Sequence, residues 1–247
     1  MIKHGAVVIP ARYESSRFPG KPLADINGKT MIKHVYQQCV KAVGQDLVYV
    51  ATDSDEIKNC VEKFGGKVIM TSSLCLTGTD RIAEVNNILE LDFIINVQGD
   101  EPMTEPDHVA IVFKAMQEDT SCVLNCFCAI SQDEIKMSSV PKVVVSKSRR
   151  LIYMSRGGVP FDKEQHSHAK YKQICIYGFS RDHLRAFAEQ SHKTENEECE
   201  DIEILRFLDM DIPVQMIQVS HGGIAVDTPE DLTRVKQVLA NNTQISN

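Results

Sequence analysis

Residues 5–21 read G-A-V-V-I-P-A-R-Y-E-S-S-R-F-P-G-K, an apolar run that passes directly into a loop rich in cations. The apolar run, Gly5–Pro10, has the length and composition of a buried β-strand. The loop after it carries Arg12, Arg17 and Lys21, although the chain as a whole has a net charge of −7. Such a local concentration of positive charge predicts a small, strongly negative ligand at the end of this strand.

Short apolar runs and amphipathic segments continue to alternate through the first half of the chain. We expect strands at Gly5–Pro10, Leu47–Ala51, Lys67–Met70 and Phe93–Val97, and helices at Thr30–Ala42, Ser54–Phe64 and Asp80–Leu91. Strands separated by helices pair in parallel through right-handed crossovers, which predicts a doubly wound, mostly parallel α/β sheet of the Rossmann-like type. Ligands of such sheets bind beyond the carboxyl ends of the strands. Because polar segments follow all four strands, we expect the functional site at that edge.

The second half of the chain has a less regular pattern. We expect strands at Val123–Ile130, Val143–Val145, Cys175–Phe179 and Val214–Val219, and helices at Val109–Gln117, Arg181–Glu189, Glu197–Leu208 and Pro229–Leu239. Leu151–Tyr153 leads into the polar segment S-R-G-G-V-P. Because the sequence has neither a repeat nor a clean linker, we expect a single domain over residues 1–247. Its first half covers about residues 1–105, and a smaller β-rich portion belongs to about residues 106–247.

Composition narrows the class of protein further. Apolar residues make up 43% of the 247 residues, which is enough for one sizeable core. The negative net charge argues against a nucleic-acid-binding surface, because such surfaces need a basic face. No apolar run approaches the roughly 20 residues that cross a bilayer, and the amino terminus does not resemble a secretion signal. We therefore expect a cytoplasmic protein with neither a nucleic-acid partner nor a membrane partner.

The eight cysteines predict neither a disulfide framework nor a metal centre. Only Cys122, Cys126 and Cys128 lie close together, inside the apolar run S-C-V-L-N-C-F-C-A-I. A zinc site normally needs a second ligand pair at a recognisable spacing, and none follows. A chain of this size needs no disulfides, and reduced cysteines pack as small apolar residues. We therefore expect buried thiols, with zinc ligation as the weaker alternative.

The basic loop matches neither of two common nucleotide-binding patterns. Lys21 is followed by proline rather than Ser or Thr, which excludes a Walker A loop, and G-x-G-x-x-G is absent. Arg12 and Arg17 can each hold phosphate oxygens in bidentate fashion, while Lys21 is a mobile point charge. With further hydroxyl donors from Ser15 and Ser16, the loop predicts a polyphosphate ligand. The alternative is a solvated loop whose charge balances acidic neighbours.

Two carboxylates complement the basic loop. Asp100 follows the predicted strand Phe93–Val97, so its side chain faces the same edge of the sheet. Asp227 lies in A-V-D-T-P-E-D-L, near the carboxyl terminus. Mg²⁺ is commonly held by one or two carboxylates together with phosphate oxygens, so the pair predicts a magnesium site. Because D-T-P is also a good helix entry, a structural role is an even alternative for Asp227.

Six stretches together resemble one known family. They are V-V-I-P-A-R-Y-E-S-S-R-F-P-G-K-P-L (7–23), T-G-T-D-R (77–81), N-V-Q-G-D-E-P (96–102), Y-M-S-R (153–156), E-x-x-E-x-L-R (200–206) and V-D-T-P-E-D-L (226–232). In this order they resemble the 3-deoxy-manno-octulosonate (Kdo) cytidylyltransferases, the CMP-Kdo synthetases of lipopolysaccharide biosynthesis. The resemblance covers essentially the whole chain, and the combination is more specific than any single stretch.

The resemblance implies an Mg²⁺-dependent enzyme that transfers CMP from CTP to the anomeric hydroxyl of a 2-keto-3-deoxy sugar acid and releases pyrophosphate. The implied nucleotide-binding residues are Arg12, Ser15, Arg17, Lys21, Thr71, Gly78, Thr79, Arg81 and Gln98. The implied acceptor-binding residues are Arg156, Gln173, Tyr177, Glu200 and Glu203. The metal ligands are Asp100 and Asp227, which join Arg12 and Lys21 as the catalytic set. A cytoplasmic homodimer is also implied, formed through residues 106–247, which bind the acceptor, whereas residues 1–105 bind the nucleotide.

Two positions depart from the family pattern on the acceptor side. Where the family carries K-H-x-G-x-Y-x-Y, this chain has Y-K-Q-I-C-I-Y-G-F. Gln173 therefore replaces a histidine, and Cys175 replaces a glycine. An imidazole that can carry charge has become a neutral amide, so the acceptor is either Kdo or a different acid. Such acids include 8-amino-Kdo, another ulosonic acid or a phosphonate.

Two further functional classes remain as alternatives. A sugar-1-phosphate nucleotidyltransferase shares the sheet and a basic first loop but uses a phosphorylated acceptor. A nucleotide-binding scaffold that performs no chemistry is the non-enzymatic alternative. The presence of Lys21, Asp100 and Asp227 together favours an enzyme, because a scaffold has no need of both metal carboxylates.

Overall fold

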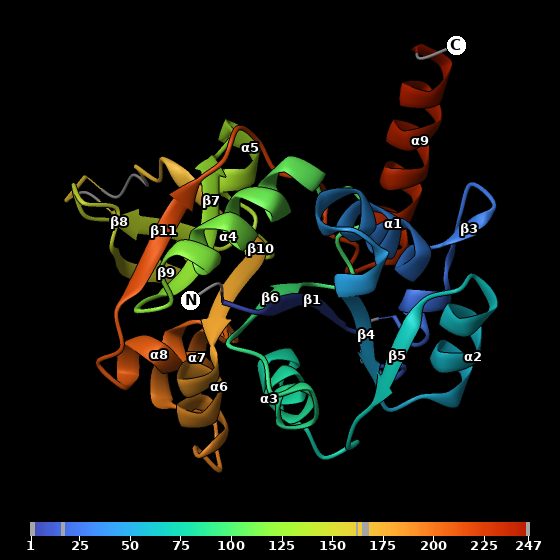
Figure 1. The fold of residues 1–247 in the computed structure, drawn as a ribbon. Helices are drawn as coiled ribbons and strands as arrows, with labels where there is room; N and C mark the ends of the chain where they lie inside the picture. Colours follow the sequence, from blue (N-terminus) through green and yellow to red (C-terminus); the bar gives the residue numbers. More distant parts are fainter. Residues whose placement is uncertain (1–2, 16–17, 162, 165–167, 246–247) are drawn as a thin grey trace.

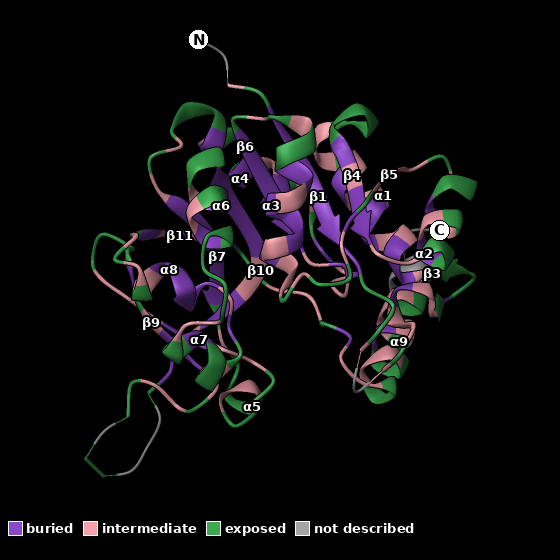
Figure 2. Cartoon of the chain, turned by 90° about the horizontal axis from the view of Figure 1, so that it is seen from below, coloured by how far each residue is buried: buried purple, intermediate pink, exposed green. Residues whose placement is uncertain are grey.

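The computed structural model describes residues 3–15, 18–161, 163–164 and 168–245. Across these residues, nine strands form one central mixed sheet, and helices cover both of its faces (Figure 1). The main path of the sheet contains, in spatial order, β11 (Val214–Gln218), β7 (Val123–Ala129), β10 (Tyr171–Ser180), β6 (Phe93–Val97), β1 (Gly5–Pro10), β4 (Val48–Thr52) and β5 (Lys67–Met70). The strands lie buried between helices whose outer faces are exposed (Figure 2).

The first half of the sheet is parallel, as the sequence predicts. β1 pairs with β4 and β6, and β4 pairs with β5, all in parallel. The connecting helices are α1 (Met31–Val43), α2 (Asp55–Lys63) and α3 (Gly78–Leu89). α3 begins two residues before the predicted start, because Thr77 is its N-cap and forms a capping box with Asp80. α2 begins as predicted after Ser54, whose hydroxyl accepts a hydrogen bond from the Ile57 N–H.

β10 makes the second half of the sheet mixed. It runs antiparallel to both β6 and β7, whereas β7 and β11 are parallel to each other. β8 (Lys142–Val145) pairs with β10, and β9 (Leu151–Ser155) pairs with β8. Because Ile176 of β10 pairs with Val97 at the end of β6, the amino end of β10 extends past the carboxyl end of β6. The two halves of the chain therefore contribute side chains to the same edge of the sheet.

The helices of the second half surround these strands. They are α4 (Pro106–Glu118), α5 (Gln132–Ile135), α6 (Arg181–Ala188), α7 (Glu195–Glu200), α8 (Leu205–Asp209) and α9 (Pro229–Ile245). The single helix predicted over Glu197–Leu208 is wrong, because Asp201 takes a left-handed φ of 51° and separates α7 from α8. Tertiary partners explain the break, since the Glu203 carboxylate accepts hydrogen bonds from the backbone at the start of α3. A continuous helix could not present that side chain in the same way.

A short hairpin supports the segment that leads to α9. β2 (Asp25–Ile26) and β3 (Lys29–Thr30) are joined by Asn27 and Gly28, whose φ angles of 52° and 85° suit a tight hairpin turn. Ile26 packs in a small buried cluster with Met31, Val226 and Val235. This cluster anchors the residue just before Asp227, so the hairpin helps to fix the position of that carboxylate. Two 3₁₀ turns, η1 (Lys21–Leu23) and η2 (Gln45–Leu47), complete the described first half.

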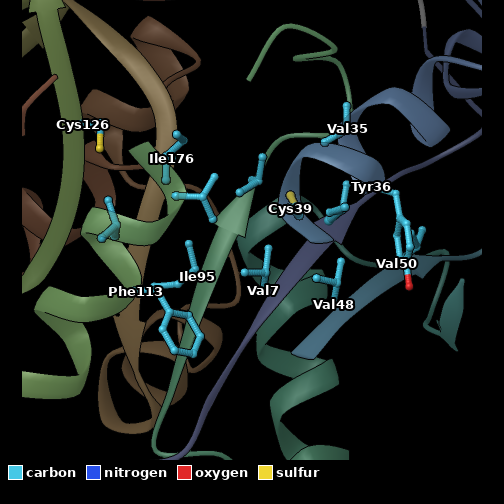
Figure 3. Packing of buried hydrophobic residues seen from close by; sticks show 14 of the residues in the cluster. Val7, Val35, Tyr36, Cys39, Val48, Val50, Ile95, Phe113, Cys126 and Ile176 are labelled. Carbon is cyan, nitrogen blue, oxygen red and sulfur yellow. The ribbon is translucent and has the colours of Figure 1, made fainter. Parts of the chain in front are cut away.

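The core has one layer on each face of the sheet. On one face, Val7 and Ile95 pack against side chains of α1 and α4 such as Val35 and Phe113 (Figure 3). On the other face, the strands pack against α3, α6 and α8. Every cysteine is a free thiol, and Cys126 and Cys128 are buried whereas Cys122 is partly exposed. The described residues contain neither a group of three or more potential metal ligands nor a helix long and apolar enough to cross a bilayer.

Candidate active site

A polar cleft of about 610 Å³ lies at the carboxyl edge of the parallel strands. One wall is formed by the loop after β1, which contributes Arg12, Ser15 and Lys21. The turn after β6 and the start of α3 form the floor, with Gln98, Asp100, Gly78 and Arg81. The opposite wall comes from the second half of the chain and includes Ser138, Ser139, Arg156, Lys193, Asp201 and Glu203. The cleft is therefore where the sheet topology predicts a ligand site.

Lys21 joins the two predicted metal carboxylates. Its Nζ lies 2.6 Å from Oδ2 of Asp100 and 3.3 Å from Oδ1 of Asp227, and it also donates to the Val226 carbonyl at 3.2 Å. Burial lowers the pKa of Lys21, but the two carboxylates outweigh it and leave the pKa above its ordinary value. The three side chains, separated by up to 206 residues in the sequence, therefore form one charged cluster.

Backbone packing brings this cluster together. A Cβ on Gly99 would lie 2.7 Å from the Pro10 carbonyl oxygen, so only glycine allows the turn after β6 to approach the end of β1 so closely. The Val226 N–H donates to the Asp100 carbonyl at 2.9 Å, which ties the segment before α9 to the same turn. The Asp231 carboxylate accepts from the Asp227 and Thr228 N–H groups, which fixes the helix entry. Thr228 and Pro229 begin α9 as predicted.

The donor set of this cluster fits Mg²⁺. Asp100 and Asp227 converge on the single ammonium of Lys21, so their carboxylates lie close to one common point in the cleft. Among the described residues no third carboxylate, histidine or cysteine joins them. Two carboxylates with room for phosphate oxygens and water match the preference of Mg²⁺, which is seldom held by an all-protein cage.

The predicted nucleotide-binding residues outside the basic loop occupy two different depths. Gly78, Arg81 and Gln98 line the cleft, whereas Thr71 and Thr79 do not. The Arg81 side chain is 3% exposed, and its guanidinium donates to Asp53 Oδ2 at 2.8 Å and to the Thr71 hydroxyl. Arg81 and its partners thus form a rigid support at the start of α3, with Arg81 reaching the cleft surface.

Glu203 holds the amino end of α3. Its carboxylate accepts hydrogen bonds from the Gly78 N–H at 3.0 Å, from the Thr79 N–H at 2.9 Å and from the Thr79 hydroxyl. Burial raises the pKa of Glu203, and these hydrogen bonds oppose the increase. Glu203 was predicted to bind the acceptor, and the structure places it at the cleft with its oxygens already engaged by Gly78 and Thr79.

The other predicted acceptor residues form two groups. Arg156 lines the cleft, and Glu200 accepts from its backbone N–H at 2.8 Å and from the Ser155 hydroxyl at 2.6 Å. Gln173 and Tyr177 are buried in β10, where the Gln173 amide donates to the Tyr177 hydroxyl at 3.1 Å. They are not among the described residues that line the cleft. Any effect of Gln173 on the acceptor would therefore act through its neighbours.

Sequence motifs missed part of the cleft. Arg17 belongs to the predicted set but lies outside the described residues. Conversely, Cys75, Ser138, Ser139, Lys193 and Asp201 line the cleft without having been predicted. Cys75 lies in the loop between β5 and α3, Ser138 and Ser139 lie between α5 and β8, and Lys193 and Asp201 flank α7. None of the five is a fixed letter of the stretches that carry the family resemblance, so only the folded chain brings them to this edge.

A cleft at this sheet edge, with cations facing a pair of carboxylates, is typical of nucleotidyltransferases. The family model for cytidylyltransferases matches residues 6–215, and the chain belongs to this family. It is 40% identical to a 3-deoxy-manno-octulosonate cytidylyltransferase of Syntrophus aciditrophicus, over 94% of this chain and 96% of the relative. It is 39% identical to an 8-amino-3,8-dideoxy-manno-octulosonate cytidylyltransferase of Shewanella baltica, over 95% of this chain and 98% of the relative.

A solved structure agrees with both the fold and the family. A CMP-2-keto-3-deoxy-manno-octonic acid synthetase complexed with CTP superposes with a TM-score of 0.89 at 39% identity, covering 97% of this chain and 99% of that chain. A glucose-1-phosphate thymidylyltransferase of Bacillus anthracis, at 14% identity and a TM-score of 0.67, shares the fold alone. The predicted family and the predicted mostly parallel α/β sheet are thereby confirmed.

Proposed function

We propose that this protein transfers CMP from CTP to the anomeric hydroxyl of a 2-keto-3-deoxy sugar acid, Kdo or a close analogue, and releases pyrophosphate. The observation that carries the proposal is the cluster of Lys21, Asp100 and Asp227 in a cleft that also contains Arg12. This arrangement provides cations for a triphosphate and two carboxylates for Mg²⁺ at a single point. The solved relative holds CTP, which supports the same nucleotide here.

The reaction needs positioning and charge stabilisation rather than a protein nucleophile. The anomeric hydroxyl attacks the α-phosphorus in line, and pyrophosphate leaves on the opposite side. Arg12 and Lys21, with Arg17 from the same loop, stabilise the negative charge that grows on the pyrophosphate. Asp100 and Asp227 would hold Mg²⁺, which when bound neutralises phosphate oxygens and lowers the pKa of a coordinated hydroxyl. For Lys21 to reach a phosphate, its ammonium must leave one or both carboxylates.

Gln173 bears on which acid is the acceptor. Gln173 Nε2 donates to Asn125 Oδ1 and to the Tyr177 hydroxyl, each at 3.1 Å, so both N–H groups of its amide are engaged inside the sheet. A neutral, engaged amide favours an acceptor that makes no charge contact at this position. Relatives named for Kdo and for its 8-amino analogue have nearly equal identity to this chain. We therefore propose the 8-amino analogue as the second candidate acceptor.

The test measures pyrophosphate release from each of the four ribonucleoside triphosphates with Mg²⁺ and a panel of acceptors. The panel contains Kdo, 8-amino-Kdo, another ulosonic acid, a phosphonate and a sugar 1-phosphate. We expect release only with CTP and with at least one of the two octulosonates. The Asp100→Asn variant should lose turnover by at least about a hundredfold while still binding CTP measurably in calorimetry.

Each contrary outcome points to a different class of protein. Release with a sugar 1-phosphate and a nucleotide other than CTP would identify a sugar-1-phosphate nucleotidyltransferase. CTP binding without release for any acceptor would identify a scaffold. Near-normal turnover by the Asp100→Asn variant would refute the role of this carboxylate.

The proposal extends to assembly and location. Because the reaction consumes CTP, we place it in the cytoplasm, where that nucleotide is made. We further propose that two copies associate through the second half of the chain. In support, β9 lies beyond β8 at a margin of the sheet, and its Ile152 side chain is 56% exposed.

A further inference from the structure

An ion pair has no part in the mechanism above. It lies on the wall of the cleft that the second half of the chain forms, called here the acceptor wall. Lys193 Nζ lies 2.7 Å from Oδ1 of Asp201, and both residues line the cleft. Lys193 precedes α7 and Asp201 directly follows it, so the short helix places them on the same wall. The pair faces the β1 loop from the side that the second half of the chain supplies.

The Asp201 backbone is held in place by Arg156. The Arg156 guanidinium donates to the Asp201 carbonyl at 2.9 Å, to the Glu200 carbonyl at 2.6 Å and to the Ser138 carbonyl at 3.2 Å. Because these three contacts tie together the loops of the acceptor wall, Arg156 cannot move far to follow a ligand. Its Nη2 atom also lies 4.0 Å from Oδ2 of Asp201.

Lys193 is held far less firmly. Among the described residues, Asp201 is the one partner recorded for its ammonium, and the Lys193 side chain is 30% exposed. An ammonium has three donors on a flexible four-carbon stem, so Lys193 can turn from Asp201 toward a ligand without disturbing the backbone. Lys193 is therefore the mobile cation of this wall, and Arg156 is the fixed one.

The charges across the cleft indicate what such a ligand would be. The hydrogen bond from Lys193 lowers the pKa of Asp201, and Arg156 and Arg12 lower it further. Asp201 is thus charged, and it lines the same cleft as Lys193 and as Arg12 of the loop after β1. In the proposed reaction the acceptor's carboxylate is bonded to the anomeric carbon, so it must lie close to the α-phosphate and to this loop.

We propose that Lys193 exchanges its partner Asp201 for the C1 carboxylate of the acceptor and thereby selects acid acceptors. This inference rests on the proposed function, since it concerns the second substrate of the same reaction. In the free protein, Asp201 neutralises Lys193 and keeps it from binding other anions. When Lys193 turns to the acceptor, Asp201 remains beside the Arg156 guanidinium, so its charge is still balanced.

The test compares the octulosonate that proves active with its C1 primary amide, which has nearly the same shape but no charge. For the wild type, we expect the amide to lower kcat/KM by about ten- to a hundredfold, the range of one charge-assisted hydrogen bond. Lys193→Met should lower kcat/KM for the acid by a similar factor, mainly through KM, and leave the amide almost unaffected. Its KM for CTP should stay within about twofold of the wild type.

Two further variants separate binding from a structural effect. Lys193→Arg retains the charge and should restore most of the preference for the acid. Lys147→Met, at an exposed lysine outside the cleft, should behave like the wild type toward both acceptors. Equal losses for acid and amide in Lys193→Met would show a structural role and overturn the inference, as would an unchanged preference for the acid. If the wild type used no acid acceptor at all, the proposed function itself would fail, which is a distinct result.

Discussion

Cys75 lies on the wall of the cleft with an unusual neighbour for a thiol. Its Sγ donates to Oε2 of Glu84 at 3.2 Å, and the same carboxylate accepts the Ser72 N–H. Burial raises the pKa of Cys75 to about 11, and the Glu84 carboxylate adds to the increase. Deprotonation would place two negative charges side by side, which is the physical reason why the neutral thiol is favoured.

The reactivity of Cys75 should therefore depend strongly on pH. At pH 8 about one thousandth of this thiol is ionised, against roughly a quarter for a cysteine with an unperturbed pKa. Because the thiolate is the nucleophile, alkylation by iodoacetamide should be slow at pH 8 and accelerate up to about pH 11. Glu84→Gln should shift this rise to lower pH.

Mass spectrometry of the digested protein measures these rates residue by residue. Exposed Cys199 on α7 is the internal reference for reagent and time. Alkylation of Cys75 as fast as that of Cys199 at pH 8, or an unchanged pH profile in Glu84→Gln, would contradict the role assigned to Glu84.

Single residues also show how far the sequence could predict the site. Lys21 and Asp100 were predicted for their chemical type and their places after strands, and Asp227 for its place in A-V-D-T-P-E-D-L. Their direct pairing could not be predicted, because it depends on the contacts of Gly99 and Val226 with the chain around them. Lys193 was missed altogether, since a lysine in a polar loop looks like any other solvated charge.

At the scale of elements, α7 and α8 are held by one buried arginine. Arg206 of α8 donates to both carboxylate oxygens of Glu197 on α7, at 2.6 and 2.7 Å. It also donates to Asp80 of α3 at 3.1 Å, and its guanidinium lies 3.6 Å from the ring centroid of Phe187 on α6. Arg206 and Glu197 are both fully buried, so four helices share one desolvated charge cluster.

We expect Arg206→Met to lower the free energy of unfolding by about 3–5 kcal/mol, because it leaves the Glu197 carboxylate buried without its cationic partner. Adding Glu197→Gln should recover part of this loss, since the unpaired buried charge of Glu197 is then removed. Urea denaturation measures the three free energies, provided that the m value stays constant.

The control is an exposed pair on a neighbouring helix. Arg185 of α6 lies 3.0 Å from Asp182, and the two side chains are 70% and 79% exposed. Arg185→Met should change the free energy of unfolding by no more than about 0.5 kcal/mol. Equal effects of the two arginine substitutions would contradict the importance of the buried cluster.

Elements were easier to predict where burial alone decides them. β1, β5 and β6 have the predicted bounds, because each is a short apolar run bordered by residues that end a strand. The hairpin of β2 and β3 was missed, although Asn27-Gly28 is a strong turn signal, because its strands have only two residues each. The break between α7 and α8 depends on partners in α3 and therefore lies beyond local sequence patterns.

At the scale of the whole molecule, the proposed association of two copies makes a direct prediction. The chain has a mass of 27.7 kDa, so sedimentation should give about 55 kDa, twice that value, at micromolar concentration. Ile152→Glu places a charge at the exposed margin of the sheet and should shift the protein toward monomer.

A matched variant on another surface provides the control. Ile88 on α3 is 60% exposed, close to the 56% of Ile152, but belongs to the first half of the chain. Ile88→Glu should leave the sedimentation coefficient unchanged. A wild-type monomer, or equal effects of the two variants, would contradict association through the second half.

The antiparallel course of β10 has a consequence for how such enzymes diversify. Its amino end enters the ligand edge beside β6, yet it is built from a segment that contributes nothing to the loop after β1. Substitutions at the amino end of β10, such as glutamine at residue 173 or cysteine at residue 175, can accumulate without disturbing the loop after β1 that is proposed to bind the triphosphate. The acceptor specificity of such an enzyme can therefore change during evolution while the nucleotidyl transfer stays the same. Two relatives that are equally similar to this chain can then act on different sugars.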